Sequence, residues 1–412
     1  MLLSCSPKLN PRKLDFAYHD MLLKENKHPF QTKTTGNVPY GSGLNTLSRY
    51  PFTDFKRITW AACWFGDGDC LTPKGFTSMR VNIAPGVTID MYNLHAEAGD
   101  GEKDSLARRL GFQQLRSYLD TESTGQPVIL FGDTNCRYTE EKDPIRRLTE
   151  GDNALTDVWV QLLRGGSPPE AGTPSVECTF PNPKPGTPID TTCELIDKIL
   201  YRSSSLVRLS PHKFVNADLE FLTPSGGPLS DHYPVSASFS WELNSILRAG
   251  GDYVGVSSEY ANDGEWFSDL PASGVSFTAA SWDSGYITEL ELRSGLRLDA
   301  LSYTMNHGEK KTRGGCDGLP SSTLHVDVAK KETVTYVEAC EGPGELCGSL
   351  TVVYFRAQTS SGDAVEGGEK PLAMEGQCSI WRAPGEGWTL VGFQGRTGKG
   401  VDSLGVLWGK VF

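Results

Sequence analysis

The character of the sequence changes near residue 241, and this change limits the folds that the chain can adopt. From about residue 78 to residue 241, strand-like and helix-like stretches alternate. The expected elements are a helix at 105–119, with its apolar side at Leu106, Leu110, Phe112, Leu115 and Leu119, and strands at 87–94, 128–131, 195–201 and 233–241. This alternation predicts an α/β sandwich with sheets inside and helices outside.

Beyond residue 241 the pattern is that of an all-β domain. Gly, Ser and Pro turns separate short β-like runs, and no segment has a convincing helical period. The clearest runs are 286–292, 333–337, 350–357 and 388–393. A chain of 412 residues is longer than one hydrophobic core usually serves. We therefore expect a first domain at 1–243, a polar, Gly-rich linker at 244–263 and a second domain at 264–412.

Charge and hydropathy narrow the class of partner. The net charge is −12, whereas contacts to a phosphate backbone normally require a basic face. The charge therefore counts moderately against a nucleic-acid partner. No stretch approaches the run of about 18 apolar residues that spans a bilayer, so we expect no transmembrane segment.

The ten cysteines lack zinc-site spacing and are either buried thiols or disulfides. We favour disulfides, because three local pairs bracket Gly- and Pro-rich loops that a bridge would hold together. These pairs are Cys63/Cys70, Cys178/Cys193 and Cys340/Cys347, although the sequence alone does not fix connectivity. Disulfides predict a secreted protein, yet the apolar run at residues 1–3 is too short for a signal peptide. We therefore expect a secreted protein whose signal peptide is missing from this chain.

Four short segments place polar side chains at the ends of apolar strands. They read YNLH at 92–95, FGDTN at 131–135, IDKI at 196–199 and LSDHYPV at 229–235. The polar residues are His95, Asp133, Asn135, Asp197, Asp231 and His232. Strand ends aim side chains into a cleft above the sheet, and ligands of this kind suit Mg²⁺ or Mn²⁺ better than zinc. Each residue alone is more often structural, so the combination carries the prediction of a catalytic site.

In this order the four segments resemble the endonuclease/exonuclease/phosphatase superfamily, which includes deoxyribonucleases and sphingomyelinases. The resemblance covers about residues 15–241. It implies a four-layer, deoxyribonuclease-like α/β sandwich that hydrolyses phosphoesters with a divalent metal ion. In that family His232 would activate the attacking water, and Asp197 would hold its imidazole in the right tautomer. Asp133 and Asn135 would position the water and a phosphate oxygen, and His95 would donate to the phosphoryl group.

The metal site is where the chain departs from the family. The resemblance implies that Asp231 and Asp133 lie next to the metal ion, with Mg²⁺ or Mn²⁺ as the expected cofactor. The family's main metal-binding Glu comes from an early strand, where this chain has Leu14. A leucine cannot ligate Mg²⁺, and the residues before it do not match the family's first strand. We therefore expect the first strand to be missing and the activity to be weak or absent.

The substrate class rests on a second local likeness. The stretch LTPKGF at 71–76 resembles the secreted sphingomyelinase branch more than the nucleases. Trp60 and Trp64 either form an aromatic rim for lipid or belong to the core, which is the more common place for aromatic residues. Together with the acidic charge, this favours a phospholipid head group over nucleic acid as the phosphodiester substrate.

The second domain resembles jacalin-related lectins. The segments concerned are RLDAL at 297–301, the glycines at 308, 314 and 315, and the stretch 392–405. The resemblance implies a prism of three β-sheets and a sugar-binding GxxxD loop, here from Gly398 to Asp402. Backbone N–H groups at the glycines and the Asp402 carboxylate would bind sugar hydroxyls. Residues 309–313 interrupt the family's paired-glycine loop, and the domain could instead only dock on the first one.

These observations lead to one expectation and two alternatives. We expect a sphingomyelinase-like, metal-dependent phosphodiesterase with a carbohydrate-binding, jacalin-like domain, weakened by the absence of the metal-binding Glu at Leu14. The first alternative is a carbohydrate-binding lectin with a non-catalytic hydrolase-like domain. The second is a secreted nuclease.

Overall fold

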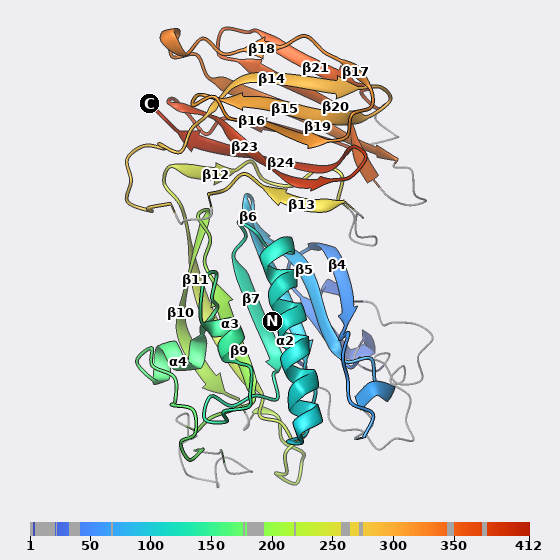
Figure 1. Cartoon of the computed structure of the whole chain (residues 1–412), viewed down its shortest axis with the longest axis vertical. Coiled ribbons are helices and arrows are strands. Elements are labelled where there is room, and N and C mark those ends of the chain that lie inside the picture. Colours follow the sequence, from blue (N-terminus) through green and yellow to red (C-terminus); the bar gives the residue numbers. More distant parts are fainter. Residues whose placement is uncertain are drawn as a thin grey trace.

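The computed structural model describes residues 3–4, 21, 23–32, 42–66, 69–175, 178, 193–217, 220–256, 264–271, 275–343, 350–372 and 377–412. The chain forms two bodies that follow one another along the long axis of the molecule (Figure 1). The first body contains a central sheet with helix α2 on one face, and the second is built from strands β12 to β24. The α/β sandwich and the all-β prism that the sequence predicts are confirmed.

The central sheet of the first body is mixed. Its six strands run in the order β4 (Phe52–Thr59), β5 (Gly75–Ala84), β6 (Val87–His95), β7 (Val128–Asp133), β9 (Asp197–Arg202) and β8 (Thr156–Asp157). Strands β6 and β7 are parallel and are connected by α2 (Glu102–Glu122). The register pairs His95 with Asp133, and Asp133 with Asp197. The ladder itself therefore brings three of the predicted site residues onto adjacent strands.

Helix α2 buries the expected side in its C-terminal half but a different side in its N-terminal half. Phe112, Leu115 and Leu119 pack into the core as expected. Leu106 and Leu110, in contrast, are 48% and 45% exposed. Arg108 and Asp104 lie on the buried side of the first turns, because both have hydrogen-bond partners there. Arg108 donates to the carbonyl of Glu97, and Asp104 accepts from the backbone N–H of Gly101.

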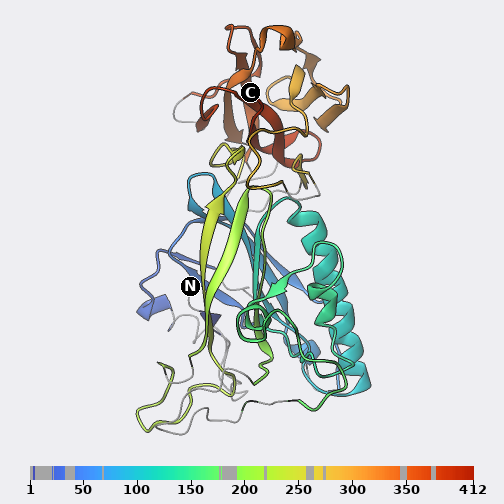
Figure 2. The same cartoon turned by 90° about the vertical axis from the view of Figure 1, so that its left-hand side faces the viewer.

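Smaller elements complete the first body. Strands β10 (Val207–Asn216) and β11 (Val235–Leu243) form an antiparallel pair beside the central sheet (Figure 2). A further small sheet has the order β1 (Leu3–Ser4), β3 (Asn45–Ser48) and β2 (Phe30–Gln31). Two short helices, α3 (Arg146–Thr149) and α4 (Val158–Leu163), lie on the chain between β7 and β9. Leu14 lies outside the described residues.

The second body is a prism of three antiparallel sheets around one core. The first sheet contains β12 (Leu247–Ala249), β24 (Val401–Lys410), β23 (Trp388–Thr397) and β13 (Glu265–Ser268). The second contains β16 (Lys310–Gly314), β15 (Leu298–Met305), β14 (Ile287–Ser294), β17 (Leu319–Pro320) and β18 (Leu324–His325). The third contains β21 (Ala364–Gly368), β20 (Leu350–Thr359), β19 (Val334–Pro343) and β22 (Cys378–Arg382). Buried side chains of all three sheets, including Leu301, Phe355 and Phe393, meet in the centre.

Part of the expected linker is a strand of this prism. β12 lies within the segment 244–263 and pairs with β24, from Leu247 opposite Gly409 to Ala249 opposite Leu407. Val254 also forms a bridge with Leu404. These residues belong to the second body because the open edge of β24 satisfies their backbone hydrogen bonds.

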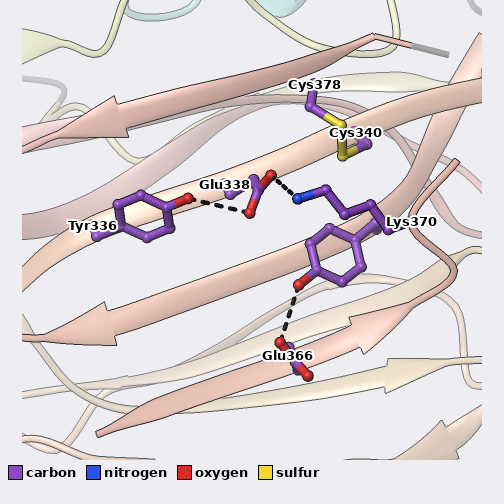
Figure 3. Close-up of a disulfide and its surroundings, with 7 residues drawn as sticks. Tyr336, Glu338, Cys340, Glu366, Lys370 and Cys378 are labelled. Atoms are coloured by element: carbon purple, nitrogen blue, oxygen red, sulfur yellow. Dashed lines mark hydrogen bonds and ion pairs between the residues drawn. A yellow bond between two sulfur atoms is a disulfide. The ribbon is translucent and has the colours of Figure 1, made fainter. Parts of the chain in front are cut away.

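Three disulfides are present among the described residues, and one differs from the expected pairing. Cys63 bonds to Cys70 and Cys178 to Cys193, as expected, but Cys340 bonds to Cys378 and not to Cys347 (Figure 3). The antiparallel register of β19 and β22 places Cys340 directly opposite Cys378. Cys136 and Cys316 are free thiols, whereas Cys5 and Cys347 lie outside the described residues. Among the described helices, none has the length and apolar character needed to cross a membrane.

Candidate functional site

Three titratable side chains, those of Asp133, Asp197 and His232, form a cluster at the C-terminal end of strand β7. This end of the central sheet points away from the second body (Figure 1). Asp133 ends β7, and Asp197 begins β9 directly opposite it. His232, from the segment before β11, places Nδ1 2.7 Å from Oδ2 of Asp197 and Nε2 3.8 Å from Oδ2 of Asp133. One ligand atom of each residue lies within 4.8 Å of the others, so the three form a compact cluster.

His95 and Asn135 lie beside Asp133. His95 ends β6, and its Nε2 is 3.5 Å from Oδ2 of Asp133. The backbone N–H of Asn135 donates to Oδ1 of Asp133 at 2.9 Å, and its Nδ2 donates to Oδ2 at 3.0 Å. Asn135 has a φ of 47°, in the left-handed region that Asn tolerates. The Asp-x-Asn turn therefore fixes the orientation of the Asp133 carboxylate.

Burial and neighbouring charges shift the pKa values of Asp133 and His232. Burial raises the pKa of Asp133 to about 7, with a further increase from the charge of Asp197, while His232 and Lys74 oppose the shift. The hydrogen bond to Asp197 raises the pKa of His232 to about 9. The carboxylates of Asp133 and Asp197 are both buried beside the single imidazole of His232. Binding of a further positive charge at this site is therefore favourable.

This donor set fits a hard divalent cation. Asp133 and Asp197 are buried carboxylates that face each other and His232, and oxygen ligands are those that Mg²⁺ and Mn²⁺ prefer. Asp231, the other predicted metal neighbour, is exposed and does not belong to this group of three. Leu14 lies outside the described residues, so its position relative to the cluster is not described.

Lys74 is a site residue that sequence reasoning missed. Its side chain is buried, with the residue 7% exposed, and its charge acts on Asp133. The available sequence signal was a lysine within the stretch 71–76. A buried lysine needs a negative partner, and only the tertiary structure identifies Asp133 as one group that it faces.

Arg108 of α2 holds the loop that follows His95. Its Nη1 donates to the backbone carbonyls of Glu97 and Gly99, both at 2.9 Å, and its Nη2 lies 2.7 Å from Oδ1 of Asp143. Glu97 is 2% exposed, and its Oε1 accepts from the backbone N–H of Trp64 at 2.8 Å. A charged residue among the apolar positions of a helix was the available sequence signal.

The two tryptophans have different environments. Trp60 belongs to the core, packs on Phe76 and donates from Nε1 to the carbonyl of His95 at 2.8 Å. Trp64 lies in the disulfide-closed loop, where Lys103 Nζ is 3.9 Å from its ring centroid. The next residue, Phe65, is 73% exposed. Trp60 is thus a core residue, whereas Phe65 is exposed at the surface.

The predicted sugar loop is the turn between β23 and β24. The N–H of Gly398 donates to the carbonyl of Gly400 at 3.0 Å. The Asp402 carboxylate lies against Gly264, where an added Cβ would be 2.2 Å from Oδ2. Gly264 is therefore a partner of this loop that sequence reasoning missed. The interrupting residues 309–313 fall mostly in β16, which extends the β15 sheet.

Two family models match the chain. Endonuclease/Exonuclease/phosphatase family 2 matches residues 12–167, and the jacalin-like lectin domain matches residues 272–407. Curated sphingomyelinases of Mycobacterium tuberculosis and Mycobacterium bovis are 35% identical over 240 residues, which is 56% of this chain and 45% of each relative. The chain thus spans about half the length of the curated relatives that it matches.

Solved structures resemble each body separately. Sphingomyelinase C from Streptomyces griseocarneus is 20% identical, with a TM-score of 0.36, and the match covers 55% of this chain and 83% of that one. A mannose-binding jacalin-related lectin from Ananas comosus is 19% identical, with a TM-score of 0.28, and the match covers 39% and 95%.

Proposed function

Because this chain carries an endonuclease/exonuclease/phosphatase family domain followed by a jacalin-like lectin domain, we propose that it is a metal-dependent phosphodiesterase of the sphingomyelinase type whose second domain binds glycans. The observation that carries the proposal is the hydrogen bond between His232 and Asp197 beside the buried carboxylate of Asp133. Three disulfides and the likeness to sphingomyelinases support a secreted protein.

The geometry suits hydrolysis by an activated water. In the neutral form of His232, with Nδ1–H donating to Asp197, Nε2 is the atom that accepts a proton from the attacking water. Asp197 also stabilises the imidazolium that forms. Asp133, oriented by Asn135, positions the water, and His95 donates a hydrogen bond to a phosphoryl oxygen. A Mg²⁺ or Mn²⁺ ion held by Asp133, with Asp231 nearby, would supply Lewis acidity at the phosphate.

A phospholipid head group is the proposed substrate. The relatives named sphingomyelinase and the net charge of −12 both favour it over nucleic acid. Leu14 stands where the family has a metal-binding Glu, so we propose that turnover is weak. The same residue favours one second candidate, a glycan-binding protein whose hydrolase-like domain is inactive.

The test measures Mg²⁺-dependent hydrolysis of sphingomyelin and of a generic aryl phosphodiester. We expect slow turnover that a chelator abolishes, a faster rate for Leu14→Glu, and a loss of about 10²–10⁴-fold for His232→Ala. The matched control is His212→Ala, an exposed histidine on β10, which keeps the native rate. If neither the native chain nor Leu14→Glu hydrolyses either substrate, the glycan-binding candidate replaces this proposal. Faster cleavage of DNA than of sphingomyelin would instead indicate a nuclease.

A further inference from the structure

The two domains are joined by a buried ionic interface centred on Arg396. This β23 side chain is 3% exposed, and its Nη2 lies 2.7 Å from Oε2 of Glu122 at the end of α2. Its Nε lies 3.4 Å from Oδ1 of Asp54 on β4, and its Nη1 donates to the carbonyl of Gly264 at 3.1 Å. One arginine therefore connects two elements of the first domain to two of the second.

Further contacts surround this arginine. The guanidinium of Arg80 pairs with Asp90 at 2.8 Å and lies 3.7 Å from the ring centroid of Trp266 in the second domain. Gln126 donates from Nε2 to Oε1 of Gln394 at 2.9 Å. Four apolar side chains of the second domain belong to the core cluster of the first, namely Leu270, Trp282, Val391 and Leu407. Because separating the domains would expose this core and unpair buried charges, the two domains hold one fixed orientation.

Helix α2 spans the distance between this interface and the candidate active site. Near its N-terminus, Arg108 binds the carbonyl of Glu97, two residues after His95. At its C-terminal end, Glu122 binds Arg396. At 1.5 Å per residue, its 21 residues extend over about 30 Å. The active-site end and the second domain therefore lie at opposite ends of the first domain (Figures 1 and 2).

The active-site end also carries exposed apolar side chains. Phe65, within the disulfide-closed loop, and Leu71, directly after it, are 73% and 65% exposed. Leu229, three residues before His232, is 55% exposed. Apolar side chains around a site for a lipid substrate favour contact with the bilayer at this end.

The predicted sugar loop, in contrast, lies at the level of the domain interface. Asp402 packs on Gly264, and the carbonyl of Gly264 accepts from Arg396. When the active-site end touches a bilayer, this loop is therefore held about 30 Å above it. The polar head-group layer of a bilayer is only about 5–8 Å thick on each side.

We propose that the second domain binds glycans that stand well above the lipid surface, as glycans carried by a membrane protein do, and not the head groups of short glycolipids in the same leaflet. This proposal rests on the proposed function, because it requires that the active site works on a bilayer. Because the domain orientation is fixed, the active site and the sugar loop can bind the bilayer and a glycan at the same time only if the glycan stands at the height of the loop.

The test uses sphingomyelin vesicles that display the same sugar at two heights. Mannose, galactose and N-acetylglucosamine are each attached either directly to a lipid or to a rigid helical spacer of about 20 residues, which is about 30 Å long. Co-sedimentation measures binding, and choline phosphate release measures hydrolysis. For at least one sugar, we expect the tall display to increase binding at least about tenfold over bare vesicles, and the short display to give no increase.

Single-residue variants distinguish a failure of the glycan-height proposal from a failure of the proposed hydrolase activity. Asp402→Asn should remove the gain from the tall display, whereas Asp283→Asn, an exposed aspartate of the same domain, should keep it. An equal or larger gain from the short display would overturn the proposal in favour of glycolipids, and no gain with any sugar would also overturn it. Hydrolysis of bare vesicles reports on the proposed function independently, so its absence in both the native chain and Leu14→Glu identifies a failure at that earlier step.

Discussion

At the scale of single residues, the candidate site is defined by how burial and hydrogen bonding change acidity. Asp197 accepts from His232 and raises the pKa of that imidazole to about 9. Asp133, buried beside the same pair, has its pKa raised to about 7. A carboxylate and an imidazole with shifted acidities in one cluster are typical of catalytic sites. The positive charge of Lys74 opposes the increase in the pKa of Asp133.

The His232–Asp197 pair predicts a pH-dependent contribution to stability. Because the folded-state pKa of His232 lies above its ordinary value of about 6.5, this contribution is complete below pH 6.5 and decreases as the pH rises through about 9. In chelator-containing buffer, the loss of unfolding free energy in His232→Gln should therefore be larger at pH 6 than at pH 9.5. Urea denaturation across this range measures it. His212→Gln, at an exposed site on β10, should show no such trend, and a pH-independent loss in His232→Gln would contradict the assignment.

At the scale of elements, α2 does more than cover the sheet. Its apolar residues Phe112, Leu115 and Leu119 fill the core, while Arg108 is buried among polar groups. Through Arg108 the helix holds the carbonyls of Glu97 and Gly99, and so fixes the loop that leaves β6 at His95. The helix thus provides both the hydrophobic support and the polar anchor of the site.

Replacing Arg108 by Met should destabilise the first domain. The change removes the ion-pair partner of Asp143 and the donor to two carbonyls. Asp143 keeps the backbone N–H of Arg137 at 2.7 Å, so we expect a loss below the roughly 3–5 kcal/mol of a fully unpaired buried charge. Denaturant unfolding measures the loss, and amide exchange should increase at residues 96–99. Adding Asp143→Asn to the variant should recover part of the stability. Arg109→Met, at the exposed neighbouring position, is the control, and an equal loss there would show that helix propensity explains the effect.

At the scale of the whole molecule, the two domains behave as one unit because their interface is built like a core. Arg396, Asp54 and Glu122 are partners across the interface, and apolar residues of both domains share one cluster. Interfaces between domains of one chain are usually more polar and more mobile than this. The fixed arrangement determines which surface can reach a substrate and which can reach a glycan.

Arg396→Met should uncouple the domains. Asp54 and Glu122 keep Arg80 and Lys56 as partial partners at 3.8 and 3.4 Å, so we expect a loss below the roughly 3–5 kcal/mol of a fully unpaired buried charge. Calorimetry should show one unfolding transition for the native chain and two for the variant. Arg382→Met, an exposed arginine on β22, should keep the single transition. Two transitions already present in the native protein would contradict the fixed interface.

The sequence by itself determined the features that depend on local pattern. Alternating apolar residues located β6, a short, fully apolar run located β7, and the helical period located α2. Polar residues in or after apolar strands pointed to His95, Asp133 and Asp197. Side-chain period and strand ends are properties of a few consecutive residues, so they can be read without knowing the fold.

Only the tertiary structure decided which distant residues meet. The register of β19 and β22 places Cys340 opposite its disulfide partner Cys378. Pairing with the edge of β24 makes β12, which was expected to be part of the linker, a strand of the second domain. Packing placed Gly264 against Asp402, Lys74 near Asp133, and Arg108 on the inner side of α2. These outcomes depend on sheet register and on the docking of one element against another. Both are set by the summed burial and hydrogen bonding of the whole domain, and no local sequence window contains that sum.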